Sequence, residues 1–288
     1  CHRLLPQDPQ TALALKTLCG FSPSEIASAF LTTEAAVAKR LTRARQKIAE
    51  LGIPFEIPVG TELTERLDGV LRVIYFLFNE GYSASTGDSV VREDLCYEAI
   101  RLASLLVSHP VANHPKLHAL LSLMLLNAAR LAAREDREGN ILRLKDQDRS
   151  LWDRSMIGHG MLHLLEALKG TELTEYHLQA GIAACHCTAE SDATTDWRKI
   201  LSYYDQWMKL GGSPVVALNR AVALSRVAGP EEGMNALESI MERGDLGSYY
   251  LLHAVLGDLE ERQNHLGAAA LHFEKALQLT EVKSEQTF

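Results

Sequence analysis

The stretch that decides the fold spans residues 22–48 and reads SPSEIASAFLTTEAAVAKRLTRARQKI. Ser22, Pro23 and Glu25 form a capping box with proline at the first helical position, which predicts the start of a short helix. The Leu-Thr-Thr segment at 31–33 ends that helix, and Thr32 or Thr33 can cap the next one. We therefore expect helices near 23–30 and 33–50, joined by a tight turn.

The second of these helices has an apolar face and a cationic face that do not overlap. At about 100° per residue, Val37, Leu41, Ala44 and Ile48 fall within about 60° of one another and predict a buried seam. The side chains that gather roughly 200–320° round from Val37 are Thr32, Ala36, Lys39, Arg40, Arg43 and Lys47. This division suits a helix that packs on its own domain by one side and on DNA by the other.

The side chains expected to face DNA are of two kinds. Small Ala35 and Ala36 near the helix start would allow close approach to base edges. The longer Lys39, Arg40, Arg43 and Lys47 would contact phosphates or guanine acceptors. A basic amphipathic helix that simply lies solvated is the alternative. The capped helix and the turn before it favour a helix-turn-helix.

Length and composition set the broad class. The 288 residues suggest one large or two ordinary domains. No run of about 18 apolar residues predicts a membrane span, and the start does not resemble a signal peptide, so we expect a soluble cytoplasmic protein. The five cysteines are odd in number and scattered, which is typical of free thiols. The chain begins at Cys1 rather than methionine, which suggests a fragment or a processed product.

Charge is divided unevenly along the chain. Residues 1–52 hold seven Lys and Arg against four Asp and Glu, a net charge of +3. The whole chain carries −8, so the remaining residues carry −11. Only the N-terminal segment suits nucleic acid, because the acidic remainder would repel phosphate. That remainder could instead contact a basic partner surface or the chain's own basic helix.

The periodicity predicts an all-α fold in two parts. A helix from about 8 to 18 completes a three-helix unit over 1–52, and Pro54 and Pro58 force an extended linker over 53–60. Helical spacing dominates the domain expected over 61–288, where no alternating strand pattern occurs. Further helices are expected near 61–79, 90–107, 114–134, 150–168, 175–187 and 195–210.

A faint repeat of about 36 residues marks the region around 196–280. The residues with the spacing of a tetratricopeptide unit are Leu256, Gly257, Ala269, Phe273 and Ala276, and an earlier set echoes them at Ala221, Gly233, Leu237 and Ile240. Glu260 stands where an aromatic is usual. The repeat therefore predicts degenerate tetratricopeptide-like helical hairpins.

Histidines and cysteines in the middle of the chain raise the question of a metal site. His159 and His163 lie one helical turn apart, and Cys185 and Cys187 follow on a later segment. However, Cys185 and Cys187 would point to different faces of a helix, and the HExxH order is absent. We therefore predict no metal site.

Two polar segments are candidates for a regulatory or interdomain role. The first holds Asp146, Asp148, Arg149 and Trp152, and it predicts a helix N-cap, an Arg–Asp pair and a tryptophan packed between helices rather than catalytic carboxylates. The second holds Asn79, Glu80 and Tyr82 around Gly81, which suits a left-handed helix end. No phosphate loop, nucleophile elbow or paired-carboxylate signature occurs, so we predict neither a cofactor nor an enzymatic activity.

The basic helix-turn-helix, with Arg43, Ala44 and Arg45 in succession, resembles region 4 of extracytoplasmic-function (ECF) RNA polymerase sigma factors. The resemblance covers nearly the full chain, and its most specific parts are Asn-Glu-Gly-Tyr at 79–82 and Asp-Gln-Asp-Arg at 146–149. Other matching segments lie at 1–2, 52–55, 98–102, 123–126, 152–153, 178–180 and 183–186. Together they resemble the group with a long C-terminal extension of tetratricopeptide-like repeats (the ECF42-like group).

This resemblance implies a role in bacterial transcription initiation. Residues 33–47 would read the promoter −35 element, with Thr32, Thr33 and Arg45 added to the DNA-binding side chains above. The region 4 unit would also dock on the β flap of core RNA polymerase, and the helical extension would regulate activity or bind a protein partner, without a membrane. Such proteins carry sigma region 2 upstream, and this chain lacks it, so it resembles a C-terminal piece.

Two other functions fit part of the pattern. An effector-responsive helix-turn-helix activator would use the helical domain to bind a small molecule. A tetratricopeptide-like interaction scaffold would use that domain to bind peptides, and the basic helix would be incidental.

Overall fold

The computed structural model describes residues 1–2, 4–54, 56, 58, 60–85, 91–244 and 246–280. In these residues the secondary structure is helical, and the isolated bridge between Glu135 and Ile141 belongs to no strand. The predicted all-α fold is confirmed. Residues 55, 57 and 59 of the predicted linker over 53–60 lie outside the described residues, as do residues 86–90 of the loop that follows Tyr82.

The chain forms two compact units. The first contains Cys1–Leu131 and Asp153–Glu172, and the second contains Ala132–Trp152 and Leu173–Phe288. The chain therefore crosses between the units three times. The sequence predicts domain boundaries at residues 52 and 61. These boundaries describe which segments fold independently, so they stay a prediction.

Three helices open the first unit: α1 (Gln7–Thr17), α2 (Pro23–Ala29) and α3 (Glu34–Glu50). The capping box is present, because Ser22 Oγ accepts a hydrogen bond from Glu25 N at 3.1 Å and Glu25 Oε2 accepts one from Ser22 N at 2.6 Å. Thr33 caps α3, since its Oγ1 accepts from Ala36 N at 3.2 Å. These caps fix the first turn of α2 and of α3, and the chain turns tightly between them.

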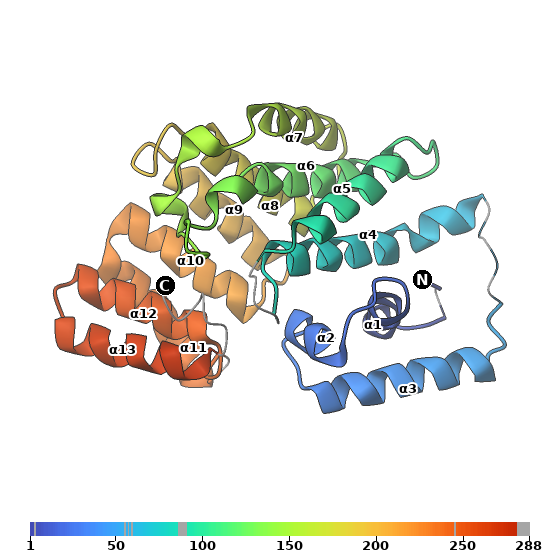
Figure 1. Cartoon of the computed structure of the whole chain (residues 1–288), viewed down its shortest axis with the longest axis horizontal. Coiled ribbons are helices and arrows are strands. Elements are labelled where there is room, and N and C mark those ends of the chain that lie inside the picture. Colours follow the sequence, from blue (N-terminus) through green and yellow to red (C-terminus); the bar gives the residue numbers. More distant parts are fainter. Residues whose placement is uncertain are drawn as a thin grey trace. The chain divides into compact units, whose positions relative to one another are not determined.

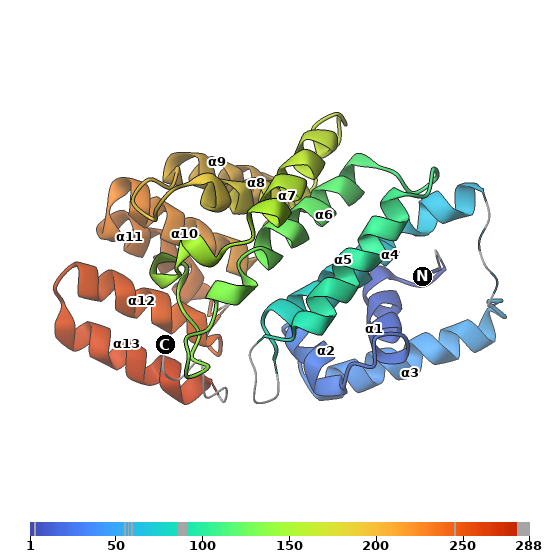
Figure 2. The same cartoon turned by 45° about the horizontal axis from the view of Figure 1, so that its top comes forward.

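The first unit continues with α4 (Thr61–Tyr82), α5 (Glu93–Val107), α6 (Pro115–Ala128) and α7 (Arg154–Ala167). Helix α1 lies between α3 and α4 (Figure 1), and α4 and α5 lie side by side (Figure 2). Helix α6 pairs with α7. The N-terminal helices and α4 therefore belong to one packed body.

Gly81 lies inside α4, which runs past the end predicted near residue 79. A Cβ on Gly81 would lie 2.7 Å from Cys96 N and 2.9 Å from Arg92 O, so only glycine fits where α4 meets α5. The left-handed helix end expected at Gly81 does not occur, because its φ is not positive. The glycine serves close packing instead of chain reversal.

Helix α6 is a core helix. The stretch Pro115–Ala133 is long and apolar enough to cross a membrane by composition alone, but 83% of its apolar window is buried inside the structure. Leu117, Leu121 and Met124 are among its fully buried side chains. The helix predicted over 114–134 ends at Ala128, and a 3-10 helix, η1 (Leu131–Ala133), follows it.

The second unit begins with two short 3-10 helices, η2 (Leu144–Asp146) and η3 (Arg149–Leu151). Because η3 occupies the start of the helix predicted over 150–168, α7 begins only at Arg154. The later helices of the second unit are α8 (Glu175–Thr188), α9 (Trp197–Lys209), α10 (Pro214–Ala228), α11 (Pro230–Arg243), α12 (Tyr250–Arg262) and α13 (Leu266–Leu279). Helix α9 packs on both α8 and α10, α10 pairs with α11, and α12 pairs with α13.

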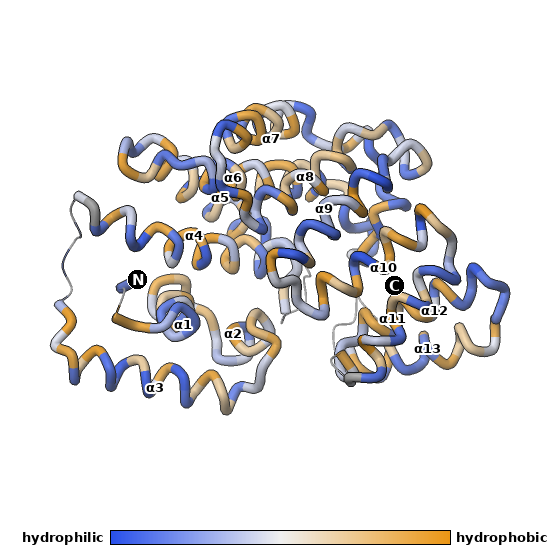
Figure 3. Tube along the Cα trace, turned by 180° about the vertical axis from the view of Figure 1, so that it is seen from behind, coloured by the Kyte–Doolittle hydropathy of each residue, from blue (hydrophilic) through white to orange (hydrophobic). Residues whose placement is uncertain are grey.

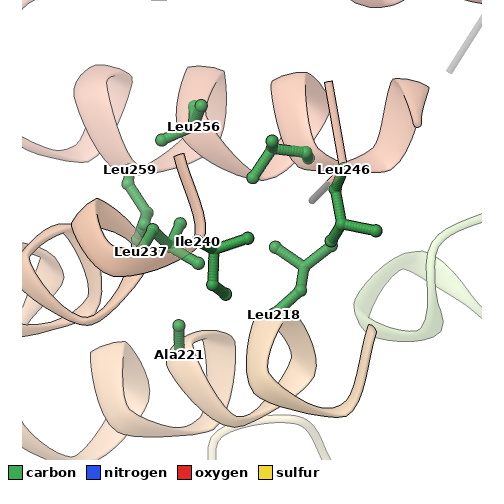
Figure 4. Close-up of a cluster of buried hydrophobic side chains, with 8 residues drawn as sticks. Leu218, Ala221, Leu237, Ile240, Leu246, Leu256 and Leu259 are labelled. Atoms are coloured by element: carbon green, nitrogen blue, oxygen red, sulfur yellow. The ribbon is translucent and has the colours of Figure 1, made fainter. Parts of the chain in front are cut away.

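The repeat residues lie at the contacts between these paired helices. A buried apolar cluster joins α10, α11 and α12 through Leu218, Ala221, Leu237, Ile240, Leu256 and Leu259 (Figure 4). A Cβ on Gly257 would lie 2.5 Å from the Phe273 ring, so α12 and α13 approach closely. Helical hairpins are therefore present where the repeat predicts them, and their tetratricopeptide-like character stays a prediction.

Candidate nucleic-acid interface

Helix α3 has one buried face and one exposed face. Val37, Leu41 and Ala44 are 0%, 5% and 2% exposed on the side that packs toward α1 and α2. Lys39, Arg43 and Lys47 are exposed. They follow one another at intervals of four residues and so form one row, called here the α3 cationic row. Figure 3 shows hydrophilic and hydrophobic residues alternating along α3.

Small side chains lie at the start of α3. Ala35 is exposed, and Thr32 and Ala36 are half-buried. The Thr33 hydroxyl accepts the hydrogen bond from Ala36 N and so serves the helix start. The N-terminus of a helix carries a partial positive charge and favours a nearby phosphate. This end of α3 therefore combines small side chains with a partial positive charge.

Arg40 lies apart from the α3 cationic row. Its guanidinium carbon is 5.0 Å from the centre of the Phe30 ring, and its Nη1 is 3.7 Å from Asp8 Oδ2. Its side chain is only 27% exposed. Both contacts come from the α1–α2 side, so the structure uses Arg40 to hold α3 on its neighbours.

Arg45 is exposed on a different side of α3 from Arg43. The two residues lie about 160° apart around the helix axis at the usual angular step. A surface centred on the α3 cationic row therefore leaves Arg45 on the far side of the helix, and its contact with DNA stays a prediction. Arg45 is therefore a natural internal control for contacts made by Arg43.

A cluster that the sequence did not predict anchors α1–α3 on α4. Asp8 Oδ1 pairs with Arg72 Nη2 at 2.7 Å, and the Arg72 guanidinium lies 5.5 Å from the centre of the Phe30 ring. Phe30 stacks on Phe76 with ring centroids 5.0 Å apart. The only sequence signal is that Arg72 and Phe76 lie one helical turn apart on α4.

Glu25 ties α2 to α5. Its Oε1 accepts a hydrogen bond from Arg92 Nη1 at 2.8 Å, while its other oxygen serves the capping box. Burial opposes its ionisation, but hydrogen bonds from Ser22 and the Arg92 charge outweigh burial and lower its pKa. Glu25 is therefore a charged carboxylate that contributes both to the start of α2 and to its attachment.

Glu80 is the buried partner on the other side of Arg92, at 4.0 Å. It accepts hydrogen bonds from Ser85 N at 3.0 Å and from Ser85 Oγ at 2.9 Å. Burial raises the pKa of Glu80, and the Ser85 hydrogen bonds offset this only in part. Glu80 therefore holds the residues that follow α4 through its hydrogen bonds with Ser85, close to the Glu25–Arg92 pair.

The other candidates of the 79–82 segment have structural partners. Tyr82 Oη accepts a hydrogen bond from Arg130, whose guanidinium also lies 5.9 Å from the centre of the Tyr82 ring. The backbone carbonyl of Asn79 accepts from Ser83 N at 2.8 Å, which closes the last turn of α4. Both residues hold the end of α4 in place.

The 146–149 segment connects η2 and η3 to the end of α8. Asp148 caps η3 by accepting from Ser150 N at 2.9 Å, and Asp146 pairs with Arg143 at 2.7 Å. Arg149 Nη1 donates to the carbonyls of His186 and Ala189 at 2.7 and 2.8 Å, and its guanidinium covers the buried Trp152. The arginine thus binds the carbonyls at the C-terminus of α8, where the helix dipole favours a positive charge.

The histidines considered for zinc form a different arrangement. His163 Nδ1 lies 2.8 Å from His118 Nδ1, and His118 Nε2 lies 2.9 Å from Asn113 Oδ1. Among the described residues, no group of three or more His, Cys, Asp and Glu side chains could hold a metal ion. The pair therefore joins α6 to α7 by a hydrogen bond in which one ring donates and the other accepts.

This His118–His163 pair predicts that stability falls at mildly acidic pH. Burial lowers the pKa of both histidines, helped by Lys169 for His118 and by His118 and His159 for His163, and opposed by Glu166. A lowered folded-state pKa means that the unfolded chain binds more protons as pH falls below about 6.5. We expect the melting temperature to fall between pH 7.5 and 5.5.

The matched variants for this pH effect are His163→Gln and His159→Gln. Glutamine at 163 can accept from a protonated His118, so the loss of stability at pH 5.5 should become smaller. The exposed His159 lies one turn away on the same helix and acts on the pKa of His163 only through its charge, a smaller cause than burial, so its replacement should change the pH profile much less than His163→Gln does. Equal pH profiles for both variants would contradict this role of the pair.

Two segments of the chain match known protein families. Residues 1–48, which hold α1, α2 and most of α3, match the model for sigma-70, region 4. Residues 66–168, which hold most of α4 and all of α5–α7, match a family of unknown function (DUF6596). The first match supports a sigma-factor region 4 for the N-terminal helices, a segment type that acts on DNA and RNA polymerase.

A curated relative matches almost the whole chain. The chain is 42% identical over 284 residues to an uncharacterized protein of Rhizobium meliloti (strain 1021), and the alignment covers 99% of this chain. The chain spans 66% of that relative's length. No solved structure matches the chain significantly.

Proposed function

We propose that this chain is the C-terminal part of a bacterial RNA polymerase sigma factor and acts in the cytoplasm by binding rather than catalysis. In this proposal α3 recognises the promoter −35 element, and α1–α3 dock on the β flap of core polymerase. The helices from α4 onward regulate activity or bind a protein partner. The region 4 match supports DNA and polymerase binding in general. The observation that carries the proposal is the exposed α3 cationic row, opposite the buried seam.

The side chains of α3 have separate roles in this proposal. Lys39, Arg43 and Lys47 contact phosphates, which positions the helix in the major groove. Thr32, Ala35 and Ala36 approach base edges at the start of the helix, and this end specifies the sequence. Thr33 caps the helix, and Arg40 holds it on α1 and α2.

The test is a selection of random-sequence duplexes by the full chain. We expect one short motif to be enriched, because base contacts at the start of α3 specify sequence. Ala36→Glu should abolish the enrichment by placing a carboxylate against the DNA. Ala49→Glu introduces the same charge at an exposed position on another side of α3 and should retain the motif. Bound duplexes that share no motif would contradict −35 recognition.

The polymerase contact has a separate test. A purified β-flap fragment should bind the full chain in the absence of DNA. Failure to bind would remove the polymerase contact from the proposal and would leave DNA recognition standing.

A further inference from the structure

The second unit contains a cavity of about 620 Å³. Its walls come from α10, α12 and α13 and from the segment 143–145. The volume falls in the range of roughly 300–1,000 Å³ that is usual for small-molecule sites. None of the α3 residues proposed to contact DNA lines it, so the proposed DNA recognition does not account for this cavity.

Apolar side chains of two paired helices line much of the cavity. Leu251 and Val255 come from α12, and Phe273 and Leu277 come from α13. Phe273 is 38% exposed and Leu277 is 47% exposed, which is unusual for large apolar side chains that lie together. An occupant with an apolar body would remove this surface from water at about 25 cal/mol per Å².

Two arginines on the cavity wall are held in fixed positions. Arg226 pairs with Asp192, and its guanidinium lies 4.8 Å from the Trp197 ring. Arg262 donates to both the hydroxyl and the carbonyl oxygen of Ser225 at 2.9 Å. A guanidinium has five N–H donors, so each arginine retains donors for an oxyanion.

Lys145 adds a cation that is not neutralised. It is exposed and makes no ion pair or hydrogen bond with any described residue. Its position is set by the Arg149 hydrogen bonds to the end of α8 and by the neighbouring Arg143–Asp146 pair. The 146–149 segment therefore also places a wall of the cavity.

The cavity is more cationic than the unit that contains it. Its lining has four Lys and Arg against three Asp and Glu. The whole second unit has 14 Lys and Arg against 21 Asp and Glu. The net charge of the lining is therefore positive, whereas that of the whole unit is negative. A positive lining favours an anionic occupant, although the remaining surface of the unit would repel an anion.

We propose that this cavity binds a small amphiphile with an apolar body and one carboxylate head. The body lies along α12 and α13, and the head accepts hydrogen bonds from Arg226, Arg262 and Lys145. This binding does not rest on the proposed DNA recognition, because it is measured without DNA.

The test is titration calorimetry of the full chain with decanoate, decanol and decylammonium, each below its micelle concentration. We expect decanoate to bind at least about tenfold more tightly than decanol, which is the effect of one charge-assisted contact. Decylammonium should bind more weakly still. Equal affinities for the three compounds would overturn the proposal, and so would the absence of any binding.

Two variants locate the bound amphiphile. Leu277→Asp places a carboxylate on the cavity wall and should weaken decanoate binding at least about tenfold. Leu271→Asp makes the same change on α13 at a 69% exposed position outside the cavity, and it should bind as the original chain does.

A third variant tests recognition of the carboxylate head: Arg262→Gln should reduce the preference for decanoate over decanol. An unchanged preference, or equal losses for both leucine variants, would overturn the proposed site.

Discussion

Replacing Lys39, Arg43 and Lys47 together by alanine should lower the affinity of the full chain for its selected duplex roughly 100-fold near 0.15 M salt. Each phosphate contact contributes about 0.9 to the slope of log K against log salt concentration, so the slope should fall by about 2.7. The fold should remain, because all three side chains are exposed and alanine favours helix. Fluorescence anisotropy at several salt concentrations measures both quantities.

The control for this triple variant is Arg45→Ala. It removes one positive charge from the same helix, about 160° from Arg43 around the axis. We expect its salt slope to stay close to that of the original chain. A triple variant with an unchanged slope, or an Arg45→Ala variant with as large a loss, would assign DNA binding to another face of α3.

The start of α2 and of α3 could be predicted from sequence because the capping contacts are local. Ser22 and Glu25 exchange hydrogen bonds across three residues, and Thr33 reaches Ala36 in the same way. The apolar seam of α3 follows from helical spacing alone. Caps and faces of this kind depend on neighbours along the chain, which are visible in the sequence.

Contacts between distant helices could not be predicted in this way. The helical wheel groups Arg40 with the DNA-facing cations, but Phe30 and Asp8 draw it toward α2 and α1. Arg149 binds the carbonyl of His186, 37 residues away, and no local spacing in the sequence indicates this contact. A side chain at the border of two faces takes its role from whichever helix packs beside it.

The contact of Gly81 with α5 is also between separate helices and could not be predicted from the sequence. It leads to a second prediction with a large effect. We expect Gly81→Ala to destabilise the first unit by about 1–3 kcal/mol. The new Cβ would lie 2.7 Å from Cys96 N and 2.9 Å from Arg92 O, and backbone atoms cannot swing aside as a flexible side chain can. The carbonyl of Gly81 also accepts from Arg92 N at 2.7 Å, so α5 must shift together with the arginine that holds Glu25.

Gly158→Ala is the matched control, since Gly158 is an exposed glycine of α7 with nothing within 4 Å of a new Cβ. That change should stabilise the unit by about 0.5–1 kcal/mol, because alanine loses less backbone entropy in a helix. Circular dichroism gives the free energies of unfolding, and hydrogen exchange should show faster exchange in α4 and α5 for Gly81→Ala alone. Since Arg92 links α5 to α2, exchange in α2 should quicken as well. Changes of the same sign in the two variants would contradict a close-packing role for Gly81.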